Sequence, residues 1–178
     1  RLREAADTSV HWLDDSGVAP DAATLHCMAE GYAPYLDAVQ RDPADVAAIT
    51  RAFERFRVLC ALREGPRGVH AINEQLSRLA RARLAAPHDS RSPWYAGRPV
   101  MVLRNDPLLE LFNGDLGITL PAADGDLRVY FAAAGGGHRA VPTLRLPAHE
   151  TAFAMTVHKA QGSEFDELLV LLPQRRSR

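Results

Sequence analysis

Residues 152–172 read AFAMTVHKAQGSEFDELLVLL, so that a polar stretch with one glycine separates two short apolar runs. The runs at 152–155 and 168–172 have the length and composition of buried strands, and Pro173 ends the second. The polar stretch therefore begins at the carboxyl end of a strand. Parallel α/β sheets bind their ligands at this edge, because rigid strands there support backbone amides and short polar side chains. The segment predicts an α/β fold with a ligand-binding loop.

Hydrogen-bond donors dominate this loop, which favours a ligand that carries phosphate groups. The donors are the side chains of Thr156, His158, Lys159 and Gln161. Gly162 lets the backbone approach a ligand or adopt a positive φ angle. Glu164 would repel a phosphate, so its expected partner is a sugar hydroxyl or a cationic side chain. The alternative interpretation is a polar connection closed by a capping glycine.

A strand, a loop and a helix are predicted earlier in the chain, at 57–62, 63–68 and 69–84. Arg63 leaves this strand at its carboxyl end, so it shares a rim with the Thr156 loop if the two strands run parallel. The competing interpretation pairs Arg63 with Glu64 or Glu164 in a structural ion pair. The apolar stripe of the helix is predicted at Ile72, Leu76 and Leu79.

Two further helical segments precede this unit. Apolar residues recur at near-helical spacing between Leu25 and Val39, and Gly31 and Pro34 predict a break in the middle. The next helix is predicted to begin at Pro43 with Asp42 as its N-cap. Its expected apolar stripe is Val46, Ile49, Phe53 and Phe56.

The pattern changes after residue 93. Short strands are predicted at 100–103, 116–120, 127–131 and 140–144, separated by glycine-containing turns. Regular short strands with tight turns predict a small antiparallel barrel. Before and within it, Trp94, Tyr95, Arg98 and Arg104 are available for base stacking or phosphate contact, although core packing is the preferred interpretation of the two aromatic residues.

Composition favours a compact cytoplasmic domain. The chain has 178 residues, 47% of them hydrophobic, and a net charge of −1. It has no apolar run near the ~20 residues that cross a bilayer. Cys27 and Cys60 lie in apolar segments and are expected to be buried thiols in a reducing compartment, and no metal site is predicted.

The charges are unevenly distributed along the chain. Residues 51–104 carry eleven basic and four acidic side chains, a net charge of +7. Arginine makes bidentate contacts to phosphate, so this part is the expected electropositive region. Arg78, Arg81 and Arg83 fit an ordinary solvated helix face, whereas Arg63 and Arg67 do not.

Three strings in this sequence resemble motifs of superfamily 1 helicases, in the form found in the RecD family, the alpha subunit of exodeoxyribonuclease V. Residues 156–166 are similar to motif V, and residues 57–73 are similar to the motif IV region. The third string is Gly97-Arg98-Pro99-Val100-Met101-Val102, followed by Arg104-Asn105-Asp106 and by residues 112–118. The three follow the family order and cover about residues 50–173.

The resemblance implies a partial RecA-like lobe, 2A, with an inserted small SH3-like antiparallel β-barrel, 2B. Residues 1–86 would form a helical segment and the first part of lobe 2A, residues 94–147 the barrel, and residues 148–178 the return to the lobe. The family's phosphate-binding loop, Gly-x-x-x-x-Gly-Lys-[Ser/Thr], and its motif VI do not occur in the sequence. The chain is therefore expected to be a C-terminal fragment that does not hydrolyse ATP alone.

The resemblance also implies roles for individual residues. Arg63 would contact the nucleotide phosphates as the catalytic arginine. Gln161, Gly162 and Glu164 would face the nucleotide, with Glu164 near the ribose. The predicted DNA contacts are Thr156, His158, Lys159, Arg67 and Arg104. ATP and Mg²⁺ are expected to bind only when the first lobe is present.

The function that this resemblance implies is ATP-dependent, 5′ to 3′ unwinding of DNA in double-strand break repair and recombination. The expected partners are single-stranded DNA and the RecB and RecC subunits of exodeoxyribonuclease V. Two alternatives stay open: a stand-alone RecD-like helicase without nuclease partners, and a non-catalytic protein-binding module.

Overall fold

The computed structural model describes residues 10–15, 17–85 and 92–173. The helices in this part are α1 (Ala22–Gly31), α2 (Ala33–Arg41), α3 (Val46–Glu54) and α4 (Val69–Arg83), with a 3-10 turn η2 (Thr143–Arg145). The strands are β1 (Phe56–Cys60), β2 (Arg98–Val102), β3 (Leu116–Pro121), β4 (Leu127–Ala132), β5 (His138–Pro142), β6 (His149–Thr151), β7 (Ala154–Thr156) and β8 (Glu167–Leu171). The predicted mixed α/β fold is confirmed.

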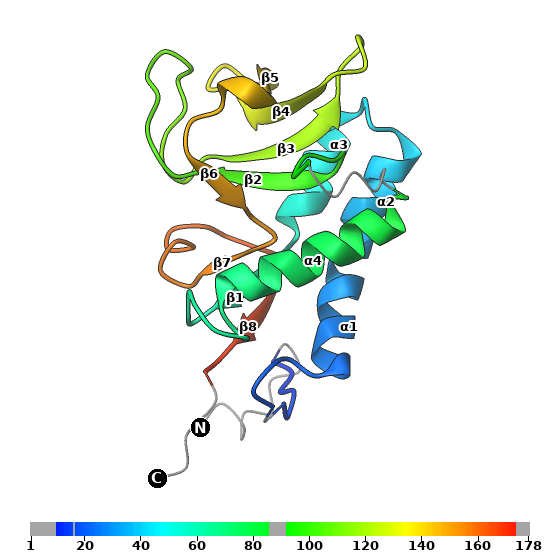
Figure 1. Ribbon diagram of the computed structural model, residues 1–178, viewed down its shortest axis with the longest axis vertical. Coiled ribbons are helices and arrows are strands. Elements are labelled where there is room, and N and C mark those ends of the chain that lie inside the picture. Colours follow the sequence, from blue (N-terminus) through cyan, green and yellow to red (C-terminus); the bar gives the residue numbers. More distant parts are fainter. Residues whose placement is uncertain (1–9, 16, 86–91, 174–178) are drawn as a thin grey trace.

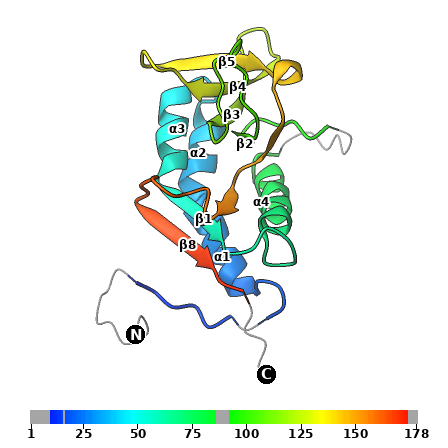
Figure 2. The same ribbon diagram turned by 90° about the vertical axis from the view of Figure 1, so that its left-hand side faces the viewer.

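Two sheets organise the molecule. A parallel sheet has the strand order β7-β1-β8, and an antiparallel sheet has the order β5-β4-β3-β2-β6. In Figure 1 the antiparallel sheet lies above the parallel one, and α4 runs in front of the region between them. Figures 1 and 2 both show the segment at β6 descending from the upper sheet to the lower one. This segment therefore ties the two sheets together.

The antiparallel sheet is open. Strand β2 pairs with both β3 and β6, and β4 pairs with both β3 and β5, which leaves β5 and β6 as the edges. In the part of the chain that the structure describes, no pairing joins β5 to β6 to close a ring. The strands themselves were predicted at nearly the observed positions, but a closed barrel is not formed.

The helical segment before β1 is broken at Tyr32, close to the predicted position. Tyr32 caps both helices, and Pro34 lies in the first turn of α2, where its missing N–H costs no hydrogen bond. The N-cap of α3 is Asp45, whose side chain accepts a bond from Ala48 N, so the prediction of Asp42 as the cap is wrong. Asp42 instead ends α2.

The main core lies between the helices and one face of the parallel sheet. Tyr32, Tyr35 and Phe153 have mutual ring contacts at 5.2 to 6.4 Å, and all three are buried. Val58 and Cys60 of β1 pack into this cluster. Burial raises the pKa of the Cys60 thiol to about 12, so it stays protonated at neutral pH. Cys27 is only half-buried, which corrects the prediction of two buried thiols.

The opposite face of the parallel sheet is covered by the chain that links β7 to β8. Ala160 and Phe165 from this link pack on Leu59 and Met155. The fully buried Arg57 donates to Ala152 O at 3.1 Å, and its guanidinium lies 4.0 Å from the Phe53 ring. The link therefore supplies part of the cover on this face, together with Leu116 of β3.

Helix α4 is held to the free edge of β7 by one side chain. Asn73 Nδ2 donates to Ala154 O at 3.0 Å, and Asn73 Oδ1 accepts from Ala154 N at 2.8 Å. The amide thus takes the place of a neighbouring strand. The buried stripe of α4 includes Ile72, Leu76 and Ala80, whereas Leu79 is 43% exposed, against the prediction.

No helix in the described ranges combines the length and the apolar character required to span a bilayer.

Candidate nucleotide and DNA site

Two loops leave neighbouring parallel strands at the same edge. Strands β1 and β7 are parallel, with Cys60 opposite Thr156, and Val157 N donates to Cys60 O at 3.1 Å. The loop at 61–68 and the start of the loop at 157–166 therefore lie side by side, as predicted. We call this edge, formed by Arg63, Thr156 and Lys159 together with Glu150, the rim.

Glu150 joins the two loops. Its carboxylate accepts from Arg63 Nη2 at 3.1 Å through one oxygen and from Lys159 Nζ at 3.0 Å through the other. The side chains of Glu150 and Lys159 are 15% and 26% exposed, whereas that of Arg63 is 49% exposed, so the Lys159 contact is the better shielded of the two. The predicted partners of Arg63, Glu64 and Glu164, are not the ones observed. Nothing in the sequence marked Glu150, because its position depends on the pairing of β6 with β2.

The first turn of the Thr156 loop is fixed by its own hydroxyl. Thr156 Oγ1 accepts from Lys159 N at 3.2 Å, which leaves His158 and Gln161 exposed. Gly162 has a φ angle of +83°, which confirms the prediction that this position uses the conformational freedom of glycine. The loop thus offers a cation held by Glu150 and exposed polar groups beyond it.

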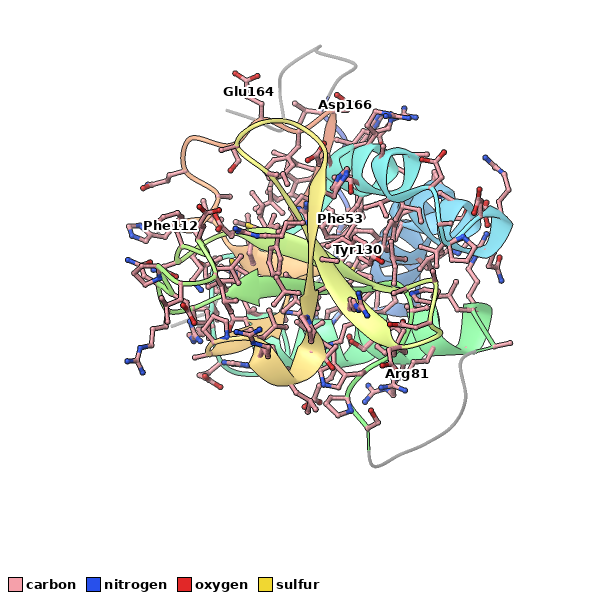
Figure 3. The ribbon with its side chains drawn as sticks, turned by 90° about the horizontal axis from the view of Figure 1, so that it is seen from above. Phe53, Arg81, Phe112, Tyr130, Glu164 and Asp166 are labelled. Carbon is pink, nitrogen blue, oxygen red and sulfur yellow. The ribbon has the colours of Figure 1, made fainter. Side chains whose placement is uncertain are left out.

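The second half of the loop leaves the rim. Asp166 pairs with Arg55 at 3.3 Å, and Glu167 N donates to Arg55 O at 2.9 Å, next to the first residue of β1. Glu164 and Asp166 project from the same side of the molecule (Figure 3). Because β8 is parallel to β1, the chain must return to the opposite edge by Glu167, so the structure shows the predicted meeting with Arg63 for the Thr156 turn only.

Arg67 does not face the rim. Its Nη1 donates to Asp15 Oδ1 at 3.0 Å and to Gly17 O at 3.0 Å, and its side chain is 10% exposed. Asp15 also accepts from Asp21 N and from Thr24 Oγ1. The predicted DNA contact of Arg67 does not fit this arrangement, because the preceding segment occupies its guanidinium.

This contact has a pH dependence that can be measured. Burial opposes ionisation of Asp15, but the hydrogen bond from Arg67 and three others outweigh it and hold the pKa of this carboxyl well below its ordinary 3.8. We expect Asp15→Asn to lower the free energy of unfolding at pH 7 by about 2 kcal/mol, since a charge-assisted bond is lost.

A depressed folded-state pKa stabilises the protein above the unfolded-state pKa, and this contribution is lost as the pH falls below it. The difference in the free energy of unfolding between the unmodified protein and Asp15→Asn should therefore shrink as the pH falls from 5 towards 2. Urea unfolding at each pH measures this difference. Asp126→Asn, at an exposed turn, serves as the control. An equal difference at all pH values would contradict the assignment.

Arg104 is not brought to the rim either. It lies beyond the end of β2, where Leu103 N donates to Ala148 O, and β6 leads away from it towards β7. Tyr95 is buried, and Trp94 packs against the ring of His149 at 5.2 Å. Core packing, the preferred interpretation of these two aromatic residues, is confirmed.

The arginine-rich face of α4 is only partly an ordinary solvated face. Arg78 is exposed, and Arg83 pairs with Asp37 at 2.5 Å across to α2. Arg81 is instead half-buried, with its guanidinium 4.3 Å from the ring of Tyr95. The prediction of solvated side chains is therefore wrong for Arg81.

Two ligands, a nucleotide and Mg²⁺, were expected at this site. Arg63 is 49% exposed, and Gln161 and Glu164 are exposed, so they can reach a nucleotide. Within residues 10–15, 17–85 and 92–173, no cluster of three or more His, Cys, Asp or Glu side chains is arranged to hold a metal ion.

Curated relatives decide the family. RecBCD enzyme subunit RecD of Mycobacterium tuberculosis (strain ATCC 25618 / H37Rv) is 37% identical over 180 residues, which cover 99% of this chain and 29% of the relative. The chain belongs to the RecD family. RecBCD enzyme subunit RecD of Haemophilus influenzae (strain ATCC 51907 / DSM 11121 / KW20 / Rd) is 40% identical over 126 residues, 71% of this chain and 18% of the relative.

This RecD-like chain spans less than a third of the length of these two relatives. No family model matches it. Among solved structures, the Bacteroides Pif1 helicase in complex with ADP-AlF3 and ssDNA aligns with a TM-score of 0.41 at 17% identity, over 86% of this chain and 44% of that one.

Proposed function

We propose that this chain is part of the ATP-dependent, 5′ to 3′ DNA helicase subunit of a RecBCD-type helicase and nuclease complex, acting in the cytoplasm in double-strand break repair. The observation that carries the proposal is the similarity over 99% of the chain to a protein named RecBCD enzyme subunit RecD. RecB and RecC would be its partner subunits. The antiparallel sheet would correspond to the SH3-like 2B insertion of this family, and the parallel sheet to part of lobe 2A.

Four residues would contact ATP: Arg63, Gln161, Gly162 and Glu164. Bound ATP would supply the phosphoanhydride bond whose cleavage drives movement. Arg63 follows the last residue of β1, and Glu164 precedes β8, whose first residue pairs with the start of β1. A nucleotide bound by all four residues would therefore extend from the rim, with its terminal phosphate at Arg63, along the link before β8, with its ribose at Glu164.

Single-stranded DNA would bind at the other side of the Thr156 turn. Lys159 is the single lysine among the 178 residues, and it lies at the rim with Thr156 and the exposed His158. A cation and short polar groups suit the sugar-phosphate backbone of DNA. Arg104, which lies away from the rim on the antiparallel sheet, would contact the strand only further along its path.

Glu150 would couple the two ligands. It holds the nucleotide-contacting Arg63 and the DNA-contacting Lys159 at the same time. A shift of Arg63 towards a nucleotide phosphate would release or redirect Glu150 and thereby change the position of Lys159. Such a link between nucleotide state and DNA contact is what stepping along a strand requires.

The DNA contact can be tested in the full-length protein. We expect Lys159→Ala to weaken binding of a fluorescent oligothymidylate about fivefold and to lower the salt slope of the affinity by about 0.7, since one phosphate contact is lost. Fluorescence anisotropy at several salt concentrations measures both quantities. Arg51→Ala, an exposed charge on α3, is the matched control. Unchanged affinity and slope for Lys159→Ala would remove the rim from the DNA path.

One observation favours protein binding as a second role. Leu108 and Leu144 are 95% and 96% exposed, and Phe112, which projects at the margin of the molecule in Figure 3, is 54% exposed. Exposed apolar side chains that form one contiguous patch mark contact surfaces, and this second role requires that these three do so. If protein contact were the only role, the chain would assemble with RecB and RecC without measurable affinity for DNA.

A further inference from the structure

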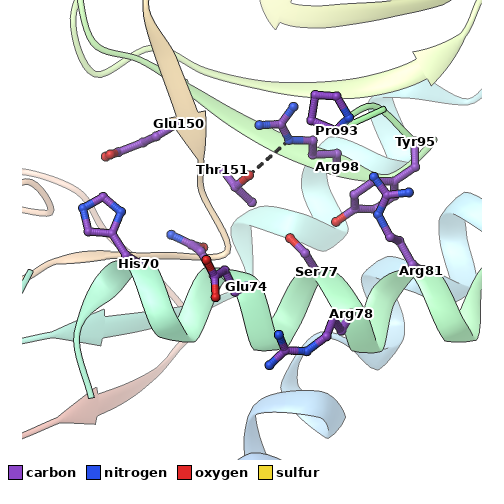
Figure 4. Close-up of a pocket in the computed structure, with 11 residues that line it drawn as sticks. His70, Glu74, Ser77, Arg78, Arg81, Pro93, Tyr95, Arg98, Glu150 and Thr151 are labelled. Atoms are coloured by element: carbon purple, nitrogen blue, oxygen red, sulfur yellow. Dashed lines mark hydrogen bonds between the residues drawn. The ribbon is translucent and has the colours of Figure 1, made fainter. Parts of the chain in front are cut away.

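A cavity of about 360 Å³ lies between α4 and the strands β2 and β6 (Figure 4). Glu150 of the rim and His70 lie at one end of it. Towards the other end lie Arg81 and Arg98, and Arg78 also contributes to the lining. The cavity therefore begins where the proposed DNA site ends and leads to a group of arginines.

Arg98 is fixed in place but incompletely paired. Its Nε donates to Thr151 Oγ1 at 3.1 Å, and its guanidinium lies 4.6 Å from the ring of Trp94. The residue is 8% exposed, and its Nη1 is buried without a hydrogen-bond partner. A buried charged donor without an acceptor is costly, so this nitrogen is suited to a ligand oxygen.

Arg81 is held in a similar way. Its guanidinium lies 4.3 Å from the ring of Tyr95, and its Nη2 donates to Ser92 O at 2.8 Å. An aromatic ring already orders each of these two arginines. Binding a ligand would therefore cost little additional side-chain entropy of the arginines. Ser77, at the same cavity wall, adds a hydroxyl donor.

Among the residues that the structure describes, neither guanidinium has a carboxylate partner. Within the described ranges, six arginines form ion pairs with carboxylates. These are Arg55, Arg63, Arg67, Arg83, Arg128 and Arg139. Burial lowers the pKa of Arg98 despite the opposing effect of Tyr95, and the nearby charge of Arg81 lowers it further. An anion between the two arginines would relieve this repulsion.

We propose that this cavity binds a backbone phosphate of single-stranded nucleic acid between Arg81 and Arg98, as a second contact for the strand that leaves the rim. The proposal rests on the proposed DNA-binding function. A pocket of this volume is larger than a lone phosphate needs and has room for the attached sugar. Glu74 and Glu150 line the cavity as well, and their charges would direct the phosphate towards the arginines.

The test uses the full-length protein and fluorescent oligothymidylate, with anisotropy over a range of salt concentrations. We expect Arg81→Gln to weaken binding about fivefold and to lower the salt slope by about 0.7. Arg98→Lys should weaken binding several-fold with little change in slope, because it keeps the charge and loses the planar fork. Arg128→Gln, a paired arginine on the antiparallel sheet, is the control. Thermal unfolding shows whether each variant is folded. If Arg98→Lys is not folded, the result for Arg81→Gln alone decides the test.

The outcomes separate this site from the rim. If Lys159→Ala weakens binding while Arg81→Gln binds as the unmodified protein does, the cavity proposal is overturned and the proposed function stands. If the unmodified protein binds no oligonucleotide, the proposed function and the nucleic-acid assignment both fail. A second experiment tests inorganic phosphate as the ligand by measuring the melting temperature in its presence. If phosphate raises the melting temperature, Arg81→Gln abolishes this increase, and Arg81→Gln does not change DNA affinity, the cavity is a site for free phosphate and the assignment to nucleic acid is overturned.

Discussion

Replacing Arg63 by alanine in the full-length protein is expected to lower the kcat of DNA-stimulated ATP hydrolysis by about 10³-fold, the low end for loss of an arginine that stabilises charge on a transferring phosphoryl group. The side chain is half-exposed at the end of β1, and Glu150 holds it in one orientation. Because Glu150 holds the guanidinium at the rim before a nucleotide binds, the arginine has only to turn from Glu150 to the phosphoryl group on which charge develops. The measurement is steady-state turnover with saturating single-stranded DNA.

Two variants control for trivial causes of this loss. Arg55→Ala removes an exposed arginine that pairs with Asp166 and should leave kcat unchanged. Arg63→Lys keeps the charge that Glu150 requires but not the bidentate fork, so its kcat should fall between those of the alanine variant and the unmodified protein. Full turnover in Arg63→Ala would exclude this residue from the nucleotide site.

The largest effect on stability is expected from Asn73. Replacing it by alanine removes both hydrogen bonds to Ala154 and leaves a backbone N–H and a backbone C=O of β7 without partners in the core. Each unsatisfied buried group costs about 1–3 kcal/mol, so Asn73→Ala should lower the free energy of unfolding by about 2–4 kcal/mol. Urea unfolding of the 178-residue chain measures this difference.

Glu74→Ala, at the exposed neighbouring position of α4, is the control and should change the stability by less than about 0.5 kcal/mol. Asn73→Asp is a sharper probe. It keeps the size of the side chain and the acceptor for Ala154 N, but it replaces the donor to Ala154 O by a carboxylate oxygen. We therefore expect it to be at least as destabilising as alanine at neutral pH. Full stability in Asn73→Asp would show that the amide does not hold the edge of β7.

Local sequence patterns were sufficient to predict most of the secondary structure. The strand-loop-helix unit at 56–83 and the four short strands after residue 97 lie within a few residues of their predicted positions. The errors come from tertiary contacts. Phe56, predicted on a helix stripe, starts β1, and Leu79 gives way to Ala80 because the helix turns its i+4 row to the core. Closure of a barrel depends on pairing between distant edges, which no local pattern encodes.

The site was predictable only where it depends on strand ends. The adjacency of Arg63 and the Thr156 turn follows from two parallel strands, and the structure has it. Glu150 and Asp15 were missed because each reaches its arginine through a long-range contact, 87 and 52 residues away in the sequence. Arg67 was misjudged for the same reason. A cationic side chain in a loop looks available until the segment that covers it is known.

The link between β7 and β8 gives one continuous stretch two duties. Phe165 and Ala160 pack against the parallel strands, while Lys159 and Glu164, each next to one of them in the sequence, are the proposed ligand contacts. Ligand binding and stability are then linked, because a ligand that binds the folded link in preference to the unfolded chain raises the melting temperature of the protein. A substitution in the link that raises ligand affinity would then also raise the stability of the ligand-bound protein, and one that weakens the packing of Phe165 or Ala160 would also weaken ligand binding.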